Sequence, residues 1–297
     1  MKILITGITG FIGQNLLPKM GTRDQIFVVC LKPVTGLPDN VFVIEADLNE
    51  PESLFDRLKI IRPDVCVHLA WEGIPDYGYE VSVKNLKNSA NFFRFLIKEC
   101  GCRKIVSTGS CWEYGKSFGL CTETDPVGAG SYFVWAKRAL CDLGLSLARE
   151  EKIDFIWLRL FYIYGPGQRD AALIPTLVRA LRKDQCPQIR TPLDANDFVH
   201  VDDVAQAITK SVFSEVPSGI YNVGSGVSSP VWRVCATIEQ CLNKNTAYFE
   251  QLKKVPCTQT ADFRADTKLT SKVLGWQAKK SLEDGIREYL KQQGAQQ

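Results

Sequence analysis

The spacing of three glycines near the amino terminus constrains the fold more than any other feature of the sequence. Residues 2–6 form a short run rich in β-branched side chains, which predicts a buried parallel strand. Gly7, Gly10 and Gly13 follow it in a Gly-x-x-Gly-x-x-Gly turn, and residues 14–18 begin a helical pattern. Glycines permit a tight bend and let backbone N–H groups approach a pyrophosphate, to which a helix amino terminus adds partial positive charge. This order of strand, turn and helix predicts a site for a dinucleotide cofactor.

Strands and helices alternate through the first two-thirds of the chain. Further strands are expected at residues 26–31, 41–45, 65–70, 104–107 and 154–159, and helices at residues 51–62, 81–100 and 133–150. This rhythm predicts an α/β fold with a doubly wound parallel Rossmann-type sheet. After about residue 165 turns and short elements interleave with helices, which indicates a smaller C-terminal α/β lobe. We therefore expect a cofactor-binding domain over residues 1–165, joined by a later strand from the C-terminal half, and a lobe over residues 166–297.

Composition argues against several classes of partner. The 297 residues include 36 basic and 33 acidic side chains, so a net charge of +3 gives no argument for nucleic acid. No apolar stretch approaches the ~20 residues of a membrane span. The first strand follows Met1 directly, which leaves no room for a signal peptide, so we expect a cytoplasmic protein with no membrane partner. Eleven scattered cysteines without paired Cys-x-x-Cys spacing predict reduced core thiols and no metal site.

Short motifs follow one another along the chain in a characteristic order. After the glycine turn come Asp47-Leu48, His68-Leu69-Ala70, residues 106–115, residues 159–167, residues 197–205, residues 221–226 and residues 274–286. With these motifs the chain resembles the extended short-chain dehydrogenase/reductase family of the nucleotide-sugar type, which comprises epimerases, dehydratases and 4-ketoreductases. The resemblance spans most of the sequence. It implies an NAD(P)-dependent oxidoreductase that acts on a nucleotide sugar, with the sugar nucleotide bound mainly by the C-terminal lobe.

The resemblance implies three catalytic positions. Ser110 stands where the family keeps the Ser or Thr that hydrogen-bonds the reacting sugar oxygen. Lys137 matches the lysine that holds the nicotinamide ribose and lowers the pKa of a neighbouring phenol. Phe133, four residues earlier, stands where the family has that phenol, which is the proton donor. Tyr132 does not replace it, because one residue along a helix is a rotation of about 100°.

The absent phenol has two explanations. The chain is either a Tyr→Phe variant made to trap a complex, or a natural family member that has lost catalysis. The rest of the motif is intact, and a site under no demand is expected to drift, so we favour the variant. Either way the activity of this chain is expected to be impaired at Phe133.

The resemblance also implies cofactor contacts. The expected cofactor-binding residues are Gly7, Gly10, Phe11, Ile12, Gly13, Lys32, Asp47, Leu48, Leu69, Ala70, Trp71, Lys137, Phe161 and Ile163. NAD-dependent members carry an acid at the end of the second strand, where it binds the adenosine ribose. Residues 30–33 contain no carboxylate, and Lys32 can meet a 2′-phosphate. We therefore expect NADP, with NAD as the alternative.

The residues after Ser110 narrow the reaction. The 4,6-dehydratases of the family place an Asp-Glu pair there, and epimerase–reductases acting on C3 and C5 place a Cys two residues after the Ser. This chain has Cys111 and Trp112 instead, so simple C4 chemistry remains. With NADPH as a consumed hydride source, we expect reduction of the C4 keto group of a nucleoside-diphosphate 4-keto-6-deoxyhexose, a step of deoxysugar biosynthesis. The alternatives are a nucleotide-sugar C4 epimerase and a catalytically inactive NADP-binding regulatory protein.

Substrate contacts and assembly follow from the same resemblance. The expected substrate-binding residues are Ser110, Trp112, Tyr162, Arg169, Ile174, Pro175 and Arg190, with the base near Ile174 and Pro175. Arg169 and Arg190 are candidates for a phosphate contact, because Asn196 stands where the family often has an arginine. Residues 81–100 and 133–150 are the family's usual dimer faces. Their apolar side chains at Phe92, Phe93, Phe95, Leu96, Leu140, Leu143 and Leu145 exceed one sheet-facing stripe, so we expect a homodimer.

Overall fold

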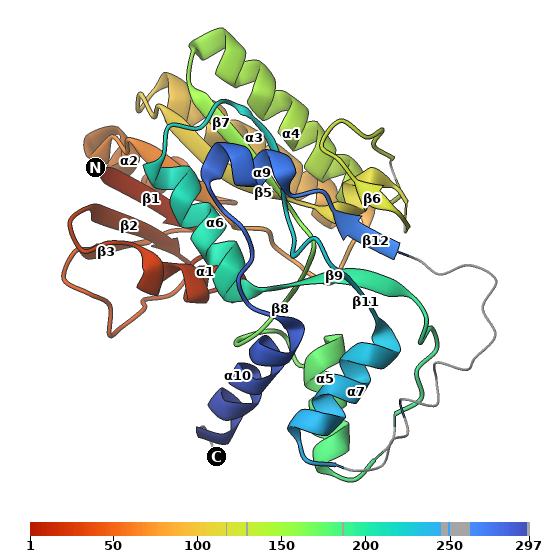
Figure 1. Ribbon diagram of the computed structural model, residues 1–297. Coiled ribbons are helices and arrows are strands. Elements are labelled where there is room, and N and C mark those ends of the chain that lie inside the picture. The colour runs from red at the N-terminus through yellow and green to blue at the C-terminus, as the bar shows by residue number, and fades with distance from the viewer. Residues whose placement is uncertain (117, 129, 186, 245–248, 250–261, 296–297) are drawn as a thin grey trace. The chain divides into compact units, whose positions relative to one another are not determined.

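Two compact units make up the chain. The computed structural model describes residues 1–116, 118–128, 130–185, 187–244, 249 and 262–295 (Figure 1). The first unit comprises Met1–Gly115, Pro126–Arg159 and Ala205–Tyr221, and the second comprises Lys116–Asp125, Leu160–Val204 and Asn222–Gln297. Each unit therefore takes segments from both halves of the chain, whereas the sequence suggested one main division near residue 165.

A seven-stranded sheet organises the first unit, in the order β10-β7-β5-β4-β1-β2-β3. Its strands are β1 (Lys2–Thr6), β2 (Gln25–Cys30), β3 (Val41–Glu45), β4 (Val65–His68), β5 (Lys104–Ser110), β7 (Asp154–Leu160) and β10 (Gly219–Val223). β1 pairs in parallel with both β2 and β4, so the strand order reverses beside it. Doubly wound sheets bind ligands at the carboxyl ends of the strands beside such a reversal. The predicted parallel Rossmann-type sheet is confirmed.

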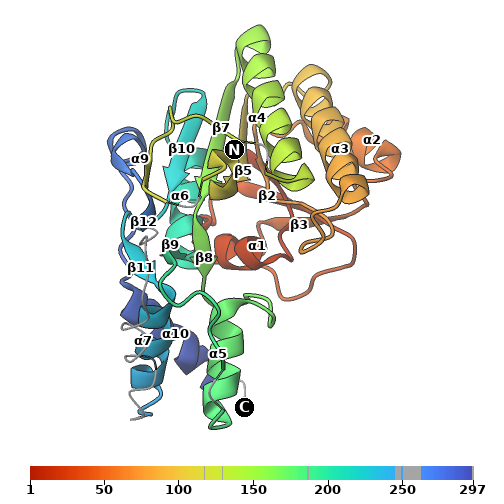
Figure 2. The same ribbon diagram turned by 90° about the vertical axis from the view of Figure 1, so that its right-hand side faces the viewer.

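Helices cover both faces of this sheet (Figure 2). α2 (Glu52–Ile61), α3 (Tyr79–Lys98) and α4 (Tyr132–Glu151) lie together on one face. α1 (Phe11–Leu16) and α6 (Val201–Phe213) lie on the other, and the short 3-10 helices are η1 (Leu17–Lys19) and η2 (Cys111–Tyr114). The three long helices predicted from periodicity are therefore confirmed, with ends shifted by one or two residues.

The apolar side chains of α3 and α4 serve the core of the first unit. Phe92, Phe93, Phe95, Leu96 and Leu140 are buried, and Leu143 and Leu145 pack half-buried against the same core. Phe95 also stacks on Phe55 of α2 with ring centres 3.7 Å apart. These side chains therefore do exceed one sheet-facing stripe, but both helices bury them against several partners within the unit, so their number alone does not require a second subunit.

Gly144 sets how closely α4 approaches the sheet. A Cβ at this position would lie 2.1 Å from Cζ of Phe155 in β7, and Phe155 itself is fully buried. Interiors are too densely packed to absorb such an overlap without a shift of the Phe155 ring or of the helix. The helix that carries Phe133 and Lys137 is therefore seated on β7 through a glycine.

The second unit has its own sheet and core. Its strands are β6 (Leu120–Cys121), β8 (Tyr162–Tyr164), β9 (Ala195–His200), β11 (Ser228–Pro230) and β12 (Asp262–Ala265), ordered β11-β9-β12-β6 with β8 beside β9. Its helices are α5 (Leu173–Arg182), α7 (Val231–Cys241), α9 (Lys268–Leu274) and α10 (Leu282–Ala295), of which α5, α7 and α10 share a core (Figure 1). Buried Asp197 accepts hydrogen bonds from the backbone N–H groups of Ser225, Gly226 and Ala265, which joins β9 to its neighbours.

The cysteines of the described residues are all free thiols. Eight are buried and Cys241 is half-buried, while Cys186 and Cys257 lie outside the described residues. Burial raises the pKa of the Cys100 thiol to about 11 and that of Cys102 to about 12, so both are protonated at neutral pH and unreactive. Within the described ranges, no cluster of three or more His, Cys, Asp or Glu residues is arranged to hold a metal ion.

None of the helices in the described part of the chain combines the length and the apolar character that a membrane crossing requires.

Candidate functional site

Close backbone contacts hold the glycine turn after β1. Gly7 has φ +76°, and a Cβ there would lie 2.6 Å from the backbone nitrogen of Ala70. A Cβ on Gly13 would lie 2.4 Å from the carbonyl oxygen of Gly7. The N–H of Gly10 donates to that same oxygen at 3.1 Å. Positions 7 and 13 therefore require glycine, as the sequence pattern suggested.

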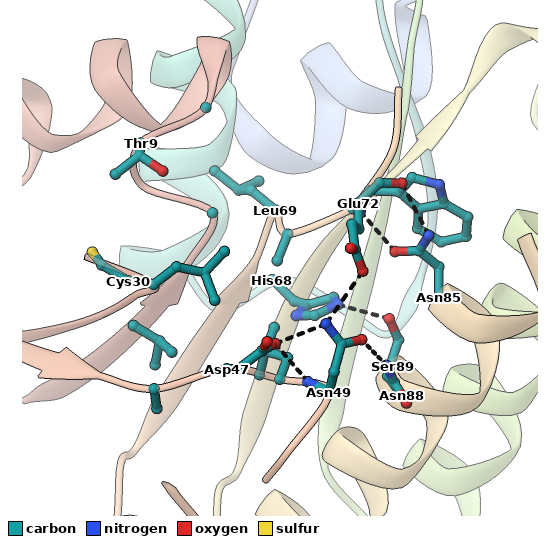
Figure 3. Close-up of a pocket in the computed structure, with 18 residues that line it drawn as sticks. Thr9, Cys30, Asp47, Asn49, His68, Leu69, Glu72, Asn85, Asn88 and Ser89 are labelled. Atoms are coloured by element: carbon teal, nitrogen blue, oxygen red, sulfur yellow. Dashed lines mark hydrogen bonds between the residues drawn. The ribbon is translucent and has the colours of Figure 1, made fainter. Parts of the chain in front are cut away.

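A cavity of about 250 Å³ opens at this turn (Figure 3). The expected cofactor-binding residues that line it are Gly7, Gly10, Asp47, Leu48, Leu69, Ala70 and Trp71. Most of the lining comes from the carboxyl ends of parallel strands and the loops that follow, where this fold class places its ligands, and the rest comes from α3. Phe11, Ile12, Gly13, Lys32 and Lys137 do not line the cavity, although Lys32 directly follows Leu31, which does.

A polar network that the sequence argument missed forms one side of the cavity. The Asn49 side chain donates to Asp47 at 2.8 Å and to Glu72 at 3.3 Å, and it accepts from Asn88 at 2.7 Å. Figure 3 shows these side chains directed toward one another between the loops after β3 and β4 and helix α3. Glu72 also pairs with Lys84 at 2.9 Å. The available signal for Asp47, Asn49 and Glu72 was their place in the loops after β3 and β4, because the carboxyl ends of parallel strands meet at one edge of a sheet. No such signal marks Asn88 on α3.

His68 is a structural residue beneath the cavity. Its Nδ1 lies 2.9 Å from the Thr6 hydroxyl and its Nε2 lies 3.0 Å from the Ser89 hydroxyl. Burial, together with the charge of Lys137, lowers the pKa of His68 to about 3. The imidazole is therefore neutral at physiological pH and fixes β1, β4 and α3 to one another.

Lys137 is buried beside Trp71. Its Nζ donates to the carbonyl oxygen of Thr108 at 2.9 Å and lies 4.0 Å from the centre of the Trp71 ring. Burial lowers the pKa of Lys137 to about 7, and the nearby Glu113 carboxylate opposes this in part. Trp71 reaches the cavity, yet its indole Nε1 is buried without a hydrogen-bond partner among the described residues. A buried donor without a partner beside a cavity fits a ligand oxygen.

Ser110 is held in place by a buried ion pair. Its hydroxyl accepts from the Trp112 N–H at 3.2 Å, and its own N–H donates to Glu113 at 2.8 Å. Glu113 is 0% exposed, and the guanidinium Nε of Arg159 lies 2.8 Å from its carboxylate. Trp157 donates to the same carboxylate at 3.2 Å. Glu113 and Arg159 therefore position the expected catalytic serine, a role that the sequence did not reveal.

Phe133 lies in a cluster of aromatic rings. The ring centres of Tyr77, Trp71 and Trp112 lie 5.2, 5.5 and 6.2 Å from its own. Lys137 Nζ lies 6.0 Å from the Phe133 ring centre. The structure therefore brings Phe133 and Lys137 into one cluster with Trp71 and Trp112.

Tyr132 lies outside this cluster. It is 55% exposed and packs edge-on against Tyr79, with ring centres 5.4 Å apart. The expectation that Tyr132 projects from a different side of the helix than Phe133 is confirmed.

The remaining expected residues belong to the second unit. Phe161 is buried and Ile163 is half-buried. Tyr162 packs against Phe198, with ring centres 5.9 Å apart. Ile174 and Pro175 are buried in α5, whereas Arg169 and Arg190 are exposed. Their contacts with cofactor or substrate stay predictions.

Comparison with known proteins agrees with the resemblance found in the motifs. The family model described as "NAD dependent epimerase/dehydratase family" matches residues 3–224. A dTDP-4-dehydro-6-deoxyglucose reductase of Escherichia coli is 28% identical over 309 residues, covering 97% of this chain and 96% of its own. A CDP-abequose synthase of Salmonella muenchen is 23% identical over 298 residues, covering 97% of both chains.

A solved structure shows the same fold. It is a Tyr-to-Phe mutant of the UDP-glucuronic acid 4-epimerase of Bacillus cereus, in complex with UDP-4-deoxy-4-fluoro-glucuronic acid and NAD. The TM-score is 0.81 at 20% identity, and the match covers 99% of this chain and 100% of the other. With the glycine turn, the parallel sheet and a family match that spans most of its length, the chain belongs to the NAD-dependent epimerase/dehydratase family.

Proposed function

We propose that the chain binds NADPH and reduces the C4 keto group of a nucleoside-diphosphate 4-keto-6-deoxyhexose. One observation carries the proposal: Trp71 lines the cavity at the glycine turn and also contacts both Phe133 and Lys137. Trp71 thereby joins the cavity lining to Phe133 and Lys137, which stand at the family's catalytic positions. The Escherichia coli relative is named as a reductase of a 4-dehydro-6-deoxy sugar nucleotide, which supports this reaction.

NADPH is the cofactor that the residues fit better. Cys30 and Leu31 line the cavity at the end of β2, where an NAD-dependent enzyme would carry a carboxylate for the ribose. Lys32 follows them as an exposed cation that can pair with a 2′-phosphate. The glycine turn would hold the pyrophosphate, Asp47 and Leu48 would flank the adenine, and the unpartnered Trp71 N–H would donate to a cofactor oxygen. NADPH, when bound, supplies a hydride to the keto carbon.

The three catalytic positions would differ in what they do. The Ser110 hydroxyl would donate to the keto oxygen, and Lys137 would leave the Thr108 carbonyl to hold the nicotinamide ribose. Phe133 occupies the place of the family's phenol and has no proton to give. General acid catalysis typically contributes about 10²–10⁴-fold, so we expect Phe133 to cause a deficit of that order. The nucleotide would be bound by residues of the second unit, with the base near Ile174 and Pro175 and the diphosphate near Arg169 or Arg190.

We also propose a homodimer through α3 and α4. Although the large apolar side chains of these helices are buried, three aromatic ones are not: Tyr79, Tyr132 and Trp135 are 54%, 55% and 43% exposed. Exposed aromatic side chains on neighbouring helices are typical of interface cores.

NADPH oxidation tests the proposed reaction directly. Purified parent chain and Phe133→Tyr are mixed with NADPH and dTDP-, CDP-, GDP- or UDP-linked 4-keto-6-deoxy sugars, and Tyr132→Phe serves as the control on the same helix. We expect turnover with one of these sugars, faster in Phe133→Tyr and unchanged in Tyr132→Phe. If neither the parent nor Phe133→Tyr oxidises NADPH with any of them, the reductase proposal is refuted. NADP binding without turnover would then favour the regulatory protein.

A further inference from the structure

We propose that Tyr77 supplies the proton that Phe133 cannot, and that this chain is a working enzyme with a relocated acid. The inference rests on the proposed reduction at Ser110 and Lys137. Tyr77 lies in the loop between β4 and α3, outside every motif that the sequence singled out.

The Tyr77 ring lies beside Phe133 and Trp112. The Tyr77 ring centre lies 5.2 Å from that of Phe133, with the planes tilted by 59°. It also lies 5.4 Å from the ring centre of Trp112, two residues after Ser110. Tyr77 therefore packs between the residue that has lost its hydroxyl and the segment that carries the catalytic serine.

The Tyr77 hydroxyl is also available. It forms no hydrogen bond within the described residues, and the side chain is half-buried. Other tyrosine hydroxyls are engaged: that of Tyr164 donates to the carbonyl oxygen of Ser281, and that of Tyr221 donates to the carbonyl oxygen of Pro217. A phenol held by its ring with a free hydroxyl can meet a ligand oxygen without breaking an existing bond.

The alternative tyrosines near Phe133 are placed less well. Tyr132 and Tyr79 pack on each other and are more than half exposed. The Tyr114 ring is buried under the Arg159 guanidinium, which lies 4.8 Å from its centre. Tyr77 is therefore the tyrosine whose contacts join it to the aromatic cluster around Phe133.

Lys137 provides the charge that such a donor needs. Its Nζ lies 6.0 Å from the Phe133 ring centre, and the Tyr77 ring centre lies 5.2 Å from that same point. A nearby positive charge stabilises the phenolate that remains after proton transfer, and it acts more strongly where side chains exclude water.

The step balances without a further reactant. As hydride reaches the keto carbon from the reduced nicotinamide, the C–O π bond breaks and its electron pair goes to the oxygen. That oxygen takes the proton of the Tyr77 hydroxyl while Ser110 donates a hydrogen bond to it. The products are the C4 alcohol, NADP⁺ and the Tyr77 phenolate, which water reprotonates before the next turnover.

A double-mutant cycle tests the relocated acid. NADPH oxidation is measured for the parent, Tyr77→Phe, Phe133→Tyr and the double variant, with Tyr79→Phe as the matched control. We expect Tyr77→Phe to lower kcat about 10²-fold or more with KM nearly unchanged. Adding Phe133→Tyr to Tyr77→Phe should restore kcat, and the gain should be larger than in the parent, where Tyr77 already acts. Tyr79→Phe should have no effect.

Failure of the Tyr77 proposal and failure of the proposed reduction give different results. If Tyr77→Phe keeps the parent kcat while Phe133→Tyr raises it, the reductase stands and the role of Tyr77 is refuted. If no variant turns over, the proposed reduction fails, and a second measurement decides on Tyr77. With 3-fluorotyrosine at position 77, the ¹⁹F resonance should shift on saturation with NADP⁺, whereas the same label at position 79 should not respond. An unmoved signal at position 77 would overturn its placement at the reacting centre.

Discussion

The Nζ of Lys137 lies 4.0 Å from the centre of the Trp71 indole ring and has the Thr108 carbonyl oxygen as its acceptor. No carboxylate forms a salt bridge with this lysine in the described part of the chain. A buried ammonium with one acceptor and aromatic neighbours loses most of its hydration, which is why its pKa falls to about 7. The side chain expected to hold the cofactor therefore changes charge near neutral pH.

This shift predicts a pH-dependent stability. The folded pKa is about 7 and the unfolded value is 10.5, so between them only the unfolded chain holds the proton. The free energy of unfolding should then rise with pH through this window, by up to about 1.4 kcal/mol per pH unit, and the contribution should be constant below the window. Urea unfolding of the parent and Lys137→Met from about pH 6.5 to about pH 9 checks this. Equal pH slopes in the two proteins would contradict it.

Lys32→Asp should reduce the preference for NADPH over NADH. The exposed lysine next to Leu31 is the cation proposed to meet the 2′-phosphate, and a carboxylate there would repel the phosphate and accept the ribose hydroxyls. One exposed contact predicts a change of about tenfold or less in the ratio of dissociation constants. Fluorescence titration with both cofactors measures it, and Lys87→Asp on α3 controls for net charge. Equal affinities in the parent would rule out the NADP assignment.

Glu113→Ala should be strongly destabilising. It would leave the Arg159 guanidinium, which is 3% exposed, without its carboxylate, and it would remove the acceptor of the Ser110 N–H. Breaking a buried pair in this way typically costs about 3–5 kcal/mol. Glu151→Ala, which breaks the surface pair with Lys98, should cost less than about 1 kcal/mol. Denaturant midpoints of both variants give the comparison. Similar losses of stability would show that the buried pair of Glu113 contributes no more than the surface pair of Glu151.

Trp135→Lys should weaken the proposed dimer. The side chain is 43% exposed on α4, so the substitution removes apolar surface from the interface without opening a cavity in the core. Light scattering on a size-exclusion column should show a dimer for the parent at micromolar concentration and a larger monomer fraction for the variant. A monomeric parent would refute the assembly.

Much of the first unit could be predicted from the sequence because its signals are local. The turn at Gly7 has a fixed spacing, and α4 has an apolar periodicity that survives over 20 residues. Even the displacement of Tyr132 from Phe133 follows from helix geometry alone. By contrast, β6 has two residues and β11 has three, which is too short for any alternation to be recognised.

The parts of the site that could not be predicted depend on contacts between distant segments. Asn49 follows β3 and Asn88 lies on α3, and neither belongs to a motif, so nothing local links them. Tyr77 meets Phe133 only because the loop after β4 reaches the beginning of α4. The burial of Phe95 by Phe55 likewise depends on α2 lying beside α3. Periodicity identifies an apolar side chain, but it does not say whether a helix or a second subunit covers it.

Because Gly144 allows α4 to pack closely on β7, turnover should be sensitive to substitution at a residue that takes no part in the chemistry. Gly144 is about 10 Å along the helix axis from Lys137, and it does not line the cavity. Yet a side chain at Gly144 would overlap the buried Phe155 ring, so the ring or the helix must move, and a shift of the helix would carry Lys137 with it. A screen for lost turnover would therefore identify this remote glycine together with the catalytic residues, because a displaced helix changes the position of the Lys137 side chain.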